Sequence, residues 1–294
     1  MMKDQLTIAF FSAADWFDPK VWIDLFATLE ETLSISPQKY CLTESKWFPF
    51  VSMEATANDM TVNVLNDKKT VRKEYFSWTI RFDGRSFANL DLWKRSTEMY
   101  NECRFRFPGD WVSNDSKRTS LRLFFERAVS NMLSFYGSMD LVSIVSNESS
   151  PGRAFYNLRY EFPTFNWMSF FSNAVISFFG KGNFGILPCR ILNLPTGMVF
   201  TFGETPEEAD LNRNRKLAAE KILGMDSFVV PAAFPPIDSS SERWRQSMWR
   251  LDPAWHLPRM LDGSRKPQYT YVPTFETLAA EFAPPNSNPP TEHQ

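Results

Sequence analysis

Hydrophobic and polar residues alternate along several short segments of the chain and recur at helical spacing along others. Alternation and apolar runs predict strands at residues 5–11, 76–82, 102–107, 139–146, 155–162, 184–194 and 197–202. Helical spacing predicts helices at 19–33, 120–136, 166–179 and 206–223, with a further short helix within 53–67. The sequence "PTG" between the last two strands predicts a β-hairpin.

Residues typical of helix ends support four of these helix boundaries. Asp18 is placed to cap the helix at 19–33, and Pro19 suits its first position. Thr205 and Glu208 form a capping box around Pro206. Gly137 and Gly224 follow two of the helices, where glycine commonly ends one.

Residues 162–180 carry no charge and contain six Phe and one Trp. Their length suits a membrane span, but the polar residues form a stripe opposite an apolar face that includes Trp167, Phe170 and Phe171. Lipid would surround a lone span and penalise that polar stripe. The pattern therefore predicts a helix in the core of a globular protein, with these three aromatic residues buried.

The order of elements predicts an α+β fold, a mainly antiparallel sheet covered by the four longer helices over residues 1–225. Eleven of the twenty prolines fall between 231 and 290, so residues 226–294 are expected to form an irregular proline-rich extension packed on that domain. Its last ~10 residues are expected to be disordered.

The composition narrows the classes of function. A net charge of −2 gives no electrostatic reason to expect nucleic acid as a partner. Cys41, Cys103 and Cys189 form no CxxC pair, which is typical of free thiols in a reducing compartment. Because the first residues lack the charge and length of a signal peptide, the expected location is the cytoplasm, without a membrane partner.

Motifs for catalysis or for cofactor binding are weak. The two histidines are His256 and His293, and the cysteines are not spaced as a zinc site, so no metal and no cofactor is predicted. "GKGNFG" fits the glycine spacing of a dinucleotide-binding loop, but a helix precedes it and a strand follows, the reverse of the order that loop requires. Glu207 and Glu208 lie in the first turn of a helix, where they offset its dipole.

Two segments carry a resemblance to a known family. "FPTFNWMSFFSN", the hairpin after it and "TPEEADLNRNRKLAAEKILGM" resemble the immunity protein 52 family of bacterial toxin–immunity systems, with Trp167-Met168 as the most specific element. "LFATLEETLSISPQKYCL" is similar to the first helix of that family and the turn after it. The resemblance spans roughly residues 5–225. It implies a cytoplasmic α+β protein that binds and neutralises a cognate protein toxin and is not an enzyme.

A binding protein of this kind needs a surface rich in the residues that dominate interfaces. "RWRQSMWRLDPAW" concentrates Trp and Arg, so Arg243, Trp244, Trp249 and Arg250 are the sequence-based candidates for contacting the partner. Packing of this segment against the domain is the competing interpretation. Two other functions stay open: a hydrolase with paired carboxylates in an aromatic-lined cleft, and a non-catalytic scaffold subunit.

Overall fold

The computed structural model describes residues 4–12, 14, 16–42, 46–63, 75–93, 101–144, 165–179 and 181–223. The strands are β1 (Gln5–Ser12), β2 (Lys39–Leu42), β3 (Trp47–Pro49), β4 (Tyr75–Arg81), β5 (Phe87–Trp93), β6 (Asn101–Pro108), β7 (Ser134–Leu141), β8 (Met168–Ser172), β9 (Arg190–Leu194) and β10 (Gly197–Thr201). The helices are α1 (Pro19–Leu33), α2 (Met53–Asn58), α4 (Asp115–Asn131), α6 (Asn173–Phe179), α7 (Pro206–Leu211) and α8 (Arg213–Leu223). Short turns of other helix types are η1 (Asp59–Asn63), η2 (Gly109–Trp111) and η3 (Lys181–Ile186).

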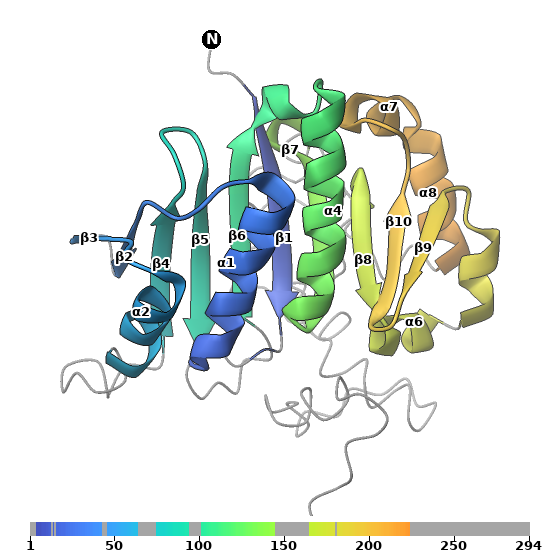
Figure 1. Cartoon of the computed structure of the whole chain (residues 1–294). Helices are drawn as coiled ribbons and strands as arrows, with labels where there is room; N and C mark the ends of the chain where they lie inside the picture. The colour runs from blue at the N-terminus through green and yellow to red at the C-terminus, as the bar shows by residue number, and fades with distance from the viewer. Residues whose placement is uncertain are drawn as a thin grey trace, which may run out of the picture.

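The strands in the described part of the chain form a single sheet in the order β3-β2-β4-β5-β6-β1-β7-β8-β10-β9. Each pairing among them is antiparallel. The first strand, β1, therefore lies in the middle, between β6 and β7, and is buried along most of its length. Figure 1 shows this sheet with α1 and α4 side by side across one face. The predicted α+β class with an antiparallel sheet is confirmed.

Aromatic side chains pack the covered face beneath α1 and α4. Trp22 of α1 stacks on Trp78 of β4, with ring centroids 5.0 Å apart. Phe10 of β1 contacts Phe124 and Phe125 of α4, at centroid distances of 6.2 and 5.7 Å. Each of these five side chains is almost fully buried. Because a buried aromatic ring removes about 150–250 Å² of surface from water, these contacts dominate the attachment of the helices to the sheet.

The opposite face of the sheet is divided into two parts. At one end, Tyr136 of β7 and Phe171 of β8 lie under Phe184 of η3 and under α8, which closes that part of the sheet. Toward β6, β5 and β4, residues on this face are only partly buried or exposed, in contrast to the apolar residues that alternate with them. The covered part belongs to the core, whereas no described helix lies over the open part.

The helix predicted at 166–179 is wrong in its first half. Residues Met168–Ser172 form β8, paired with β7 and β10, and the helix α6 starts only at Asn173. All five residues of β8 are buried because this strand has cover on both of its faces. A strand buried on both sides lacks alternation, so its apolar run resembles one turn of a buried helix.

The observed ends of another helix differ from the predicted ones, for local reasons. The helix predicted at 120–136 is α4, which starts at Asp115 with Asn114 as its cap and ends at Asn131. Gly137 does not end this helix: it lies in β7, where a Cβ would come within 3.1 Å of Val129 of α4. The absence of a side chain there allows α4 to approach the sheet closely.

Two predicted boundaries were accurate, and one predicted helix is interrupted. Asp18 accepts a hydrogen bond from the backbone N–H of Lys20 and caps α1, as expected. Thr205 accepts one from the N–H of Glu208, and the predicted hairpin joins β9 to β10. The helix expected at 206–223 is broken at Asn212, which separates α7 from α8. Residues 155–162 and 226–294 lie outside the described residues.

Candidate binding surface

The open part of the sheet carries a row of cationic and aromatic side chains. Strand register places Arg81 of β4 opposite Phe87 of β5, and Phe87 opposite Arg106 of β6. Lys39 of β2 extends the row beyond Arg81, and Trp47 of β3 lies beside it. We call these five residues the cationic face: Lys39, Trp47, Arg81, Phe87 and Arg106. Alternation in "FSWTIRF" and "ECRFRF" creates the face, since every second residue points away from α1 and α4.

Trp47 lies on the edge strand and is exposed over 37% of its surface. Two cations lie over its ring, the Nζ atom of Lys39 at 5.2 Å and the Cζ atom of Arg81 at 4.8 Å from the centroid. Cation–π contacts of this kind hold the indole against the strand and orient both charged groups. The result is a partly exposed Trp flanked by positive charge, a combination that is frequent at the centres of protein interfaces.

Arg106 occupies a more enclosed position on the same face. Its Nη1 atom donates to Oε1 of Gln5 at 3.3 Å, and its Cζ atom lies 5.8 Å from the centroid of Phe87. Its buried Nε has no hydrogen-bond partner among the described residues. Burial, and then the nearby charge of Arg104, lower the pKa of Arg106 from its ordinary value. Arg104 itself pairs with Glu102. An anion beside the Arg106 guanidinium would offset this repulsion.

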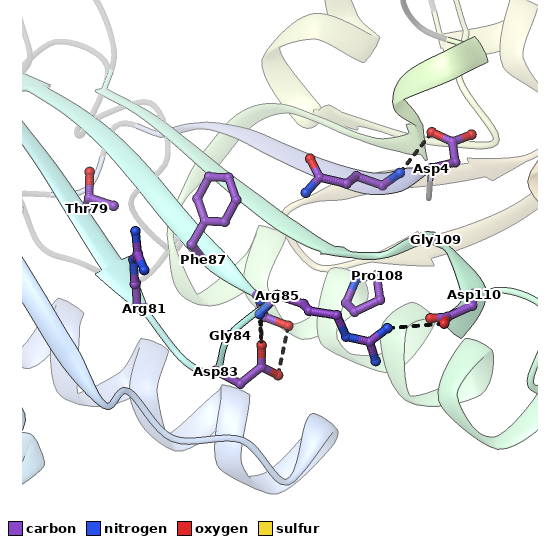
Figure 2. A pocket seen from close by; sticks show the side chains of 12 residues that line it. Asp4, Thr79, Arg81, Asp83, Gly84, Arg85, Phe87, Pro108, Gly109 and Asp110 are labelled. Carbon is purple, nitrogen blue, oxygen red and sulfur yellow. Dashed lines mark hydrogen bonds and ion pairs between the residues drawn. The ribbon is translucent and has the colours of Figure 1, made fainter. Parts of the chain in front are cut away.

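A pocket of about 380 Å³ opens at the end of the cationic face, between the β4–β5 turn and the end of β6 (Figure 2). The face and the pocket are continuous, because Arg81 and Phe87 belong to both. The other residues that line it are Asp4, Gln5, Thr79, Asp83, Gly84, Arg85, Ser86, Pro108, Gly109 and Asp110. Neither the pocket nor the open face was predicted from the sequence.

The carboxylates of this pocket hold the local structure together. Asp83 accepts hydrogen bonds from the backbone N–H groups of Arg85 and Ser86, both at 2.6 Å, and so fixes the β4–β5 turn. Asp110 pairs with Arg85 at 3.3 Å. Asp4 accepts from Ser143 and from the N–H of Gln5. These turn and ion-pair contacts account for the positions of Asp83 and Asp110.

A second pocket, of about 500 Å³, lies beside β9, β10 and α7 and includes Cys189, Arg190 and Glu204. Arg122 of α4 pairs with Glu204 at 2.8 Å and lowers the pKa of that carboxyl group. Burial raises the pKa of the Cys189 thiol to about 12. At neutral pH this thiol is protonated, so the residue is a poor nucleophile. This second pocket therefore shows no sign of thiol chemistry.

Buried charges attach α8 to the closed part of the sheet. The Nζ atom of Lys216 lies 3.6 Å from Oδ2 of Asp140 on β7, and both side chains are almost fully buried. Oδ2 of Asp140 also accepts a hydrogen bond from the N–H of Trp167 at 2.7 Å, and Glu220 accepts one from the N–H of Phe165 at 3.1 Å. Local sequence patterns do not reveal this network, because its members come from three distant segments.

The three aromatic residues expected in the core lie there. Trp167 and Phe170 are fully buried and Phe171 is almost so. The indole Nε1 of Trp167 donates to the carbonyl of Gly203 at 3.0 Å, which joins the start of β8 to the end of β10. The predicted partner-binding residues Arg243, Trp244, Trp249 and Arg250, and also His256, lie outside the described residues, so their roles stay predictions.

No group of three or more His, Cys, Asp or Glu in the described part of the chain is placed to hold a metal ion. None of the helices described is both long enough and apolar enough to cross a membrane.

Comparison with known proteins gives a likeness in fold. No protein-family model matches the chain. No curated protein sequence matches it either. Among solved structures, the chain is similar to the Pseudomonas aeruginosa T6SS protein PA0821, with a TM-score of 0.53 and 12% sequence identity. The match covers 92% of this chain and 88% of that one. At 12% sequence identity, this similarity concerns the fold alone.

Proposed function

We propose that this chain is an immunity-type protein of a bacterial cell that binds a cognate protein toxin in the cytoplasm and neutralises it by occlusion. The observation that carries the proposal is the fold that this chain shares, over most of its length, with a protein of the type VI secretion system. The sequence resemblance to the immunity protein 52 family, which rests on residues around Trp167-Met168, points to the same class of protein.

The open face supports binding as the activity of this fold. Trp and Arg are the residues most enriched at interface hot spots, and the cationic face places Trp47, Arg81 and Arg106 on one side of the sheet. The carboxylates of the adjoining pocket bond to the β4–β5 turn, to Arg85 and to Ser143. These contacts favour a binding protein over the alternative of a carboxylate-dependent hydrolase.

Neutralisation by occlusion requires a tight complex. A toxin held inactive in the cell that makes it calls for a nanomolar dissociation constant, about −12 kcal/mol. A few desolvated anchor residues must supply most of that free energy. We place these anchors on the cationic face, and the sequence-based candidates Arg243, Trp244, Trp249 and Arg250 form a second set to be tested beside it.

The test is a protection assay with the product of the reading frame immediately upstream of this gene, where the proposal expects a toxin domain. That domain is expressed in Escherichia coli from an inducible promoter, with the full chain or with an empty vector. The proposal expects the full chain to restore growth and to form a complex with the toxin of nanomolar affinity by isothermal titration calorimetry. Growth arrest despite abundant folded chain, or protection without a complex, would refute occlusion.

A further inference from the structure

The cationic face has an excess of positive charge that the described residues do not neutralise. In the part of the chain that the structure describes, Arg85, Arg104 and Arg122 each form an ion pair with a carboxylate. Arg81 and Arg106 form no such pair there, and Lys39 and Arg81 instead lie over Trp47. Positive groups left without counter-charge on an open surface favour an anionic partner.

The spacing of these cations suits an extended segment. Arg81 and Arg106 are on strands that flank β5, so their backbones lie two strand spacings apart, about 10 Å. Carboxylates at alternate positions of an extended peptide are about 7 Å apart, a separation that two long arginine side chains can span. Each guanidinium can bind a carboxylate in bidentate fashion. Phe87, between the two arginines, would lie beneath the backbone of the residue between the two carboxylates, whose own side chain points away from the sheet.

Acidic residues around the cationic face favour a peptide over a nucleic acid as its partner. Asp4, Asp83 and Asp110 line the pocket at one end of the row, and Glu102 lies on the same strand face as Arg106. A phosphate backbone carries a charge at every nucleotide and would meet these carboxylates. A short peptide can carry its negative charges only where the arginines lie and leave the pocket for an apolar side chain.

We infer that the cationic face binds an acidic, extended segment of a partner protein, with two carboxylates at alternate positions on Arg81 and Arg106 and the backbone between them over Phe87. This inference rests on the proposed function, for which it supplies the chemistry of the contact: the toxin would present acidic residues at alternate positions of an extended segment to this surface. Trp47 then closes one end of the contact, and the pocket accepts a flanking apolar side chain at the other.

The experiment uses fluorescein-labelled peptides of the sequence Gly-Glu-Phe-Glu-Phe-Glu-Gly and the same sequence with Gln in place of Glu. Binding to the full chain is followed by fluorescence anisotropy at 20 mM and at about 150 mM NaCl, where the screening length falls to about 8 Å. We expect the Glu peptide to bind at least tenfold more tightly than the Gln peptide at low salt. We also expect this preference to shrink at the higher concentration.

Three variants test whether the peptide binds at the cationic face. Arg81→Glu should weaken binding of the Glu peptide at least tenfold and create binding of the corresponding Lys peptide. Arg106→Gln should weaken it too, and thermal melting shows whether this half-buried substitution leaves the fold intact. Arg213→Glu, an exposed change on α8, is the matched control and should bind as the unaltered chain does.

Several results would overturn the inference. They are equal binding of the Gln peptide, no measurable binding of the Glu peptide, unchanged binding by Arg81→Glu, and tighter binding of a single-stranded oligonucleotide of equal charge. Binding that appears only after deletion of residues 226–294 would assign the face to this chain's own extension. Failure of the proposed function is a separate outcome. Peptide binding that depends on Arg81, without protection in cells, would support the acidic-peptide site and refute the toxin as its partner.

Discussion

Gly197, the first residue of β10, lies so close to β8 that a Cβ on it would overlap the carbonyl oxygen of Phe171 and come within 2.8 Å of the ring of Phe170. The strand pairing explains this approach, because Gly197 is the direct partner of Ser172, at the end of β8. The glycine of the "PTG" sequence thus serves the packing of two strands as well as the turn that precedes it.

Substitution of this glycine should destabilise the fold. Gly197→Ala must displace backbone or buried aromatic atoms, and overpacking of this kind costs about 1–3 kcal/mol. Urea denaturation followed by circular dichroism measures the loss. Gly84→Ala is the matched control, since a Cβ at Gly84 meets no atom within 4 Å. Equal unfolding free energies for the two variants would show that β8 and β10 can move apart to accommodate a Cβ without loss of stability.

Substitutions of Trp167 and Trp47 should affect different properties, the first the stability of the fold and the second the binding of the toxin. Trp167 is fully buried, so Trp167→Ala removes a large buried side chain and is expected to cost about 3–5 kcal/mol. Trp47→Ala, on the exposed edge strand, should cost less than about 1 kcal/mol in unfolding free energy but weaken the complex with the toxin by at least tenfold. Thermal melting and calorimetric titration of both variants check this. A Trp47→Ala protein that binds normally would move the contact away from β3.

The charged contact between α8 and the sheet gives a third prediction. Lys216→Met removes the cation near Asp140 and leaves a buried carboxylate with less compensation, which costs about 3–5 kcal/mol. The double variant with Asp140→Asn should lose less than the sum of the two single losses. Urea denaturation of the four proteins in the cycle gives the coupling. Strict additivity would mean that Asp140 and Lys216 act independently.

The Cys189 thiol gives a prediction that depends on pH. Burial raises its pKa from an ordinary 9.0 to about 12, so the folded protein holds this group protonated where the unfolded chain ionises it. Its effect on stability is therefore absent below pH 9, and stability falls as the pH rises from 9 toward 12. Cys189→Ala should flatten that alkaline decline.

The same shift slows the chemistry of the thiol. Iodoacetamide at pH 8, with peptide-resolved mass spectrometry, should label Cys189 at least about 100-fold more slowly in the folded protein than in urea. Cys41 and Cys103, which are also buried, serve as internal references in the same spectra. Rapid labelling of Cys189 in the folded state would contradict the raised pKa.

The sequence predicted the parts of this fold that depend on local patterns. Asp18 and Thr205 marked helix starts because a capping side chain bonds to backbone only two or three residues away. Helical spacing likewise located α1, whose buried residues include Trp22 and Phe26. These signals need no knowledge of what lies across the core.

Other features depended on contacts that local patterns do not record. Residues 168–172 form a strand because β7 and β10 pair with them, and a run buried on both faces does not alternate. Gly137 resembled a helix stop, yet it serves the approach of α4 to the sheet. The strand β5 was not predicted, since its place is set by pairing with β4 and β6.

The candidate site was beyond the reach of sequence patterns for a related reason. Arg81, Phe87 and Arg106 come from three strands, and only the register between them forms a row. The alternation in "FSWTIRF" and "ECRFRF" could have shown that Arg81 and Arg106 point away from the core. It could not have shown that they lie on either side of Phe87.

The division of the second sheet face has a consequence for how such a protein changes over generations. Stability resides in the aromatic layer under α1 and α4 and in the charged attachment of α8, whereas the row from Lys39 to Arg106 lies on strands whose opposite side already packs against the helices. Substitutions in that row alter what the surface recognises while the framework beneath keeps its packing. Such substitutions can therefore accumulate without compensating mutations in the rest of the fold.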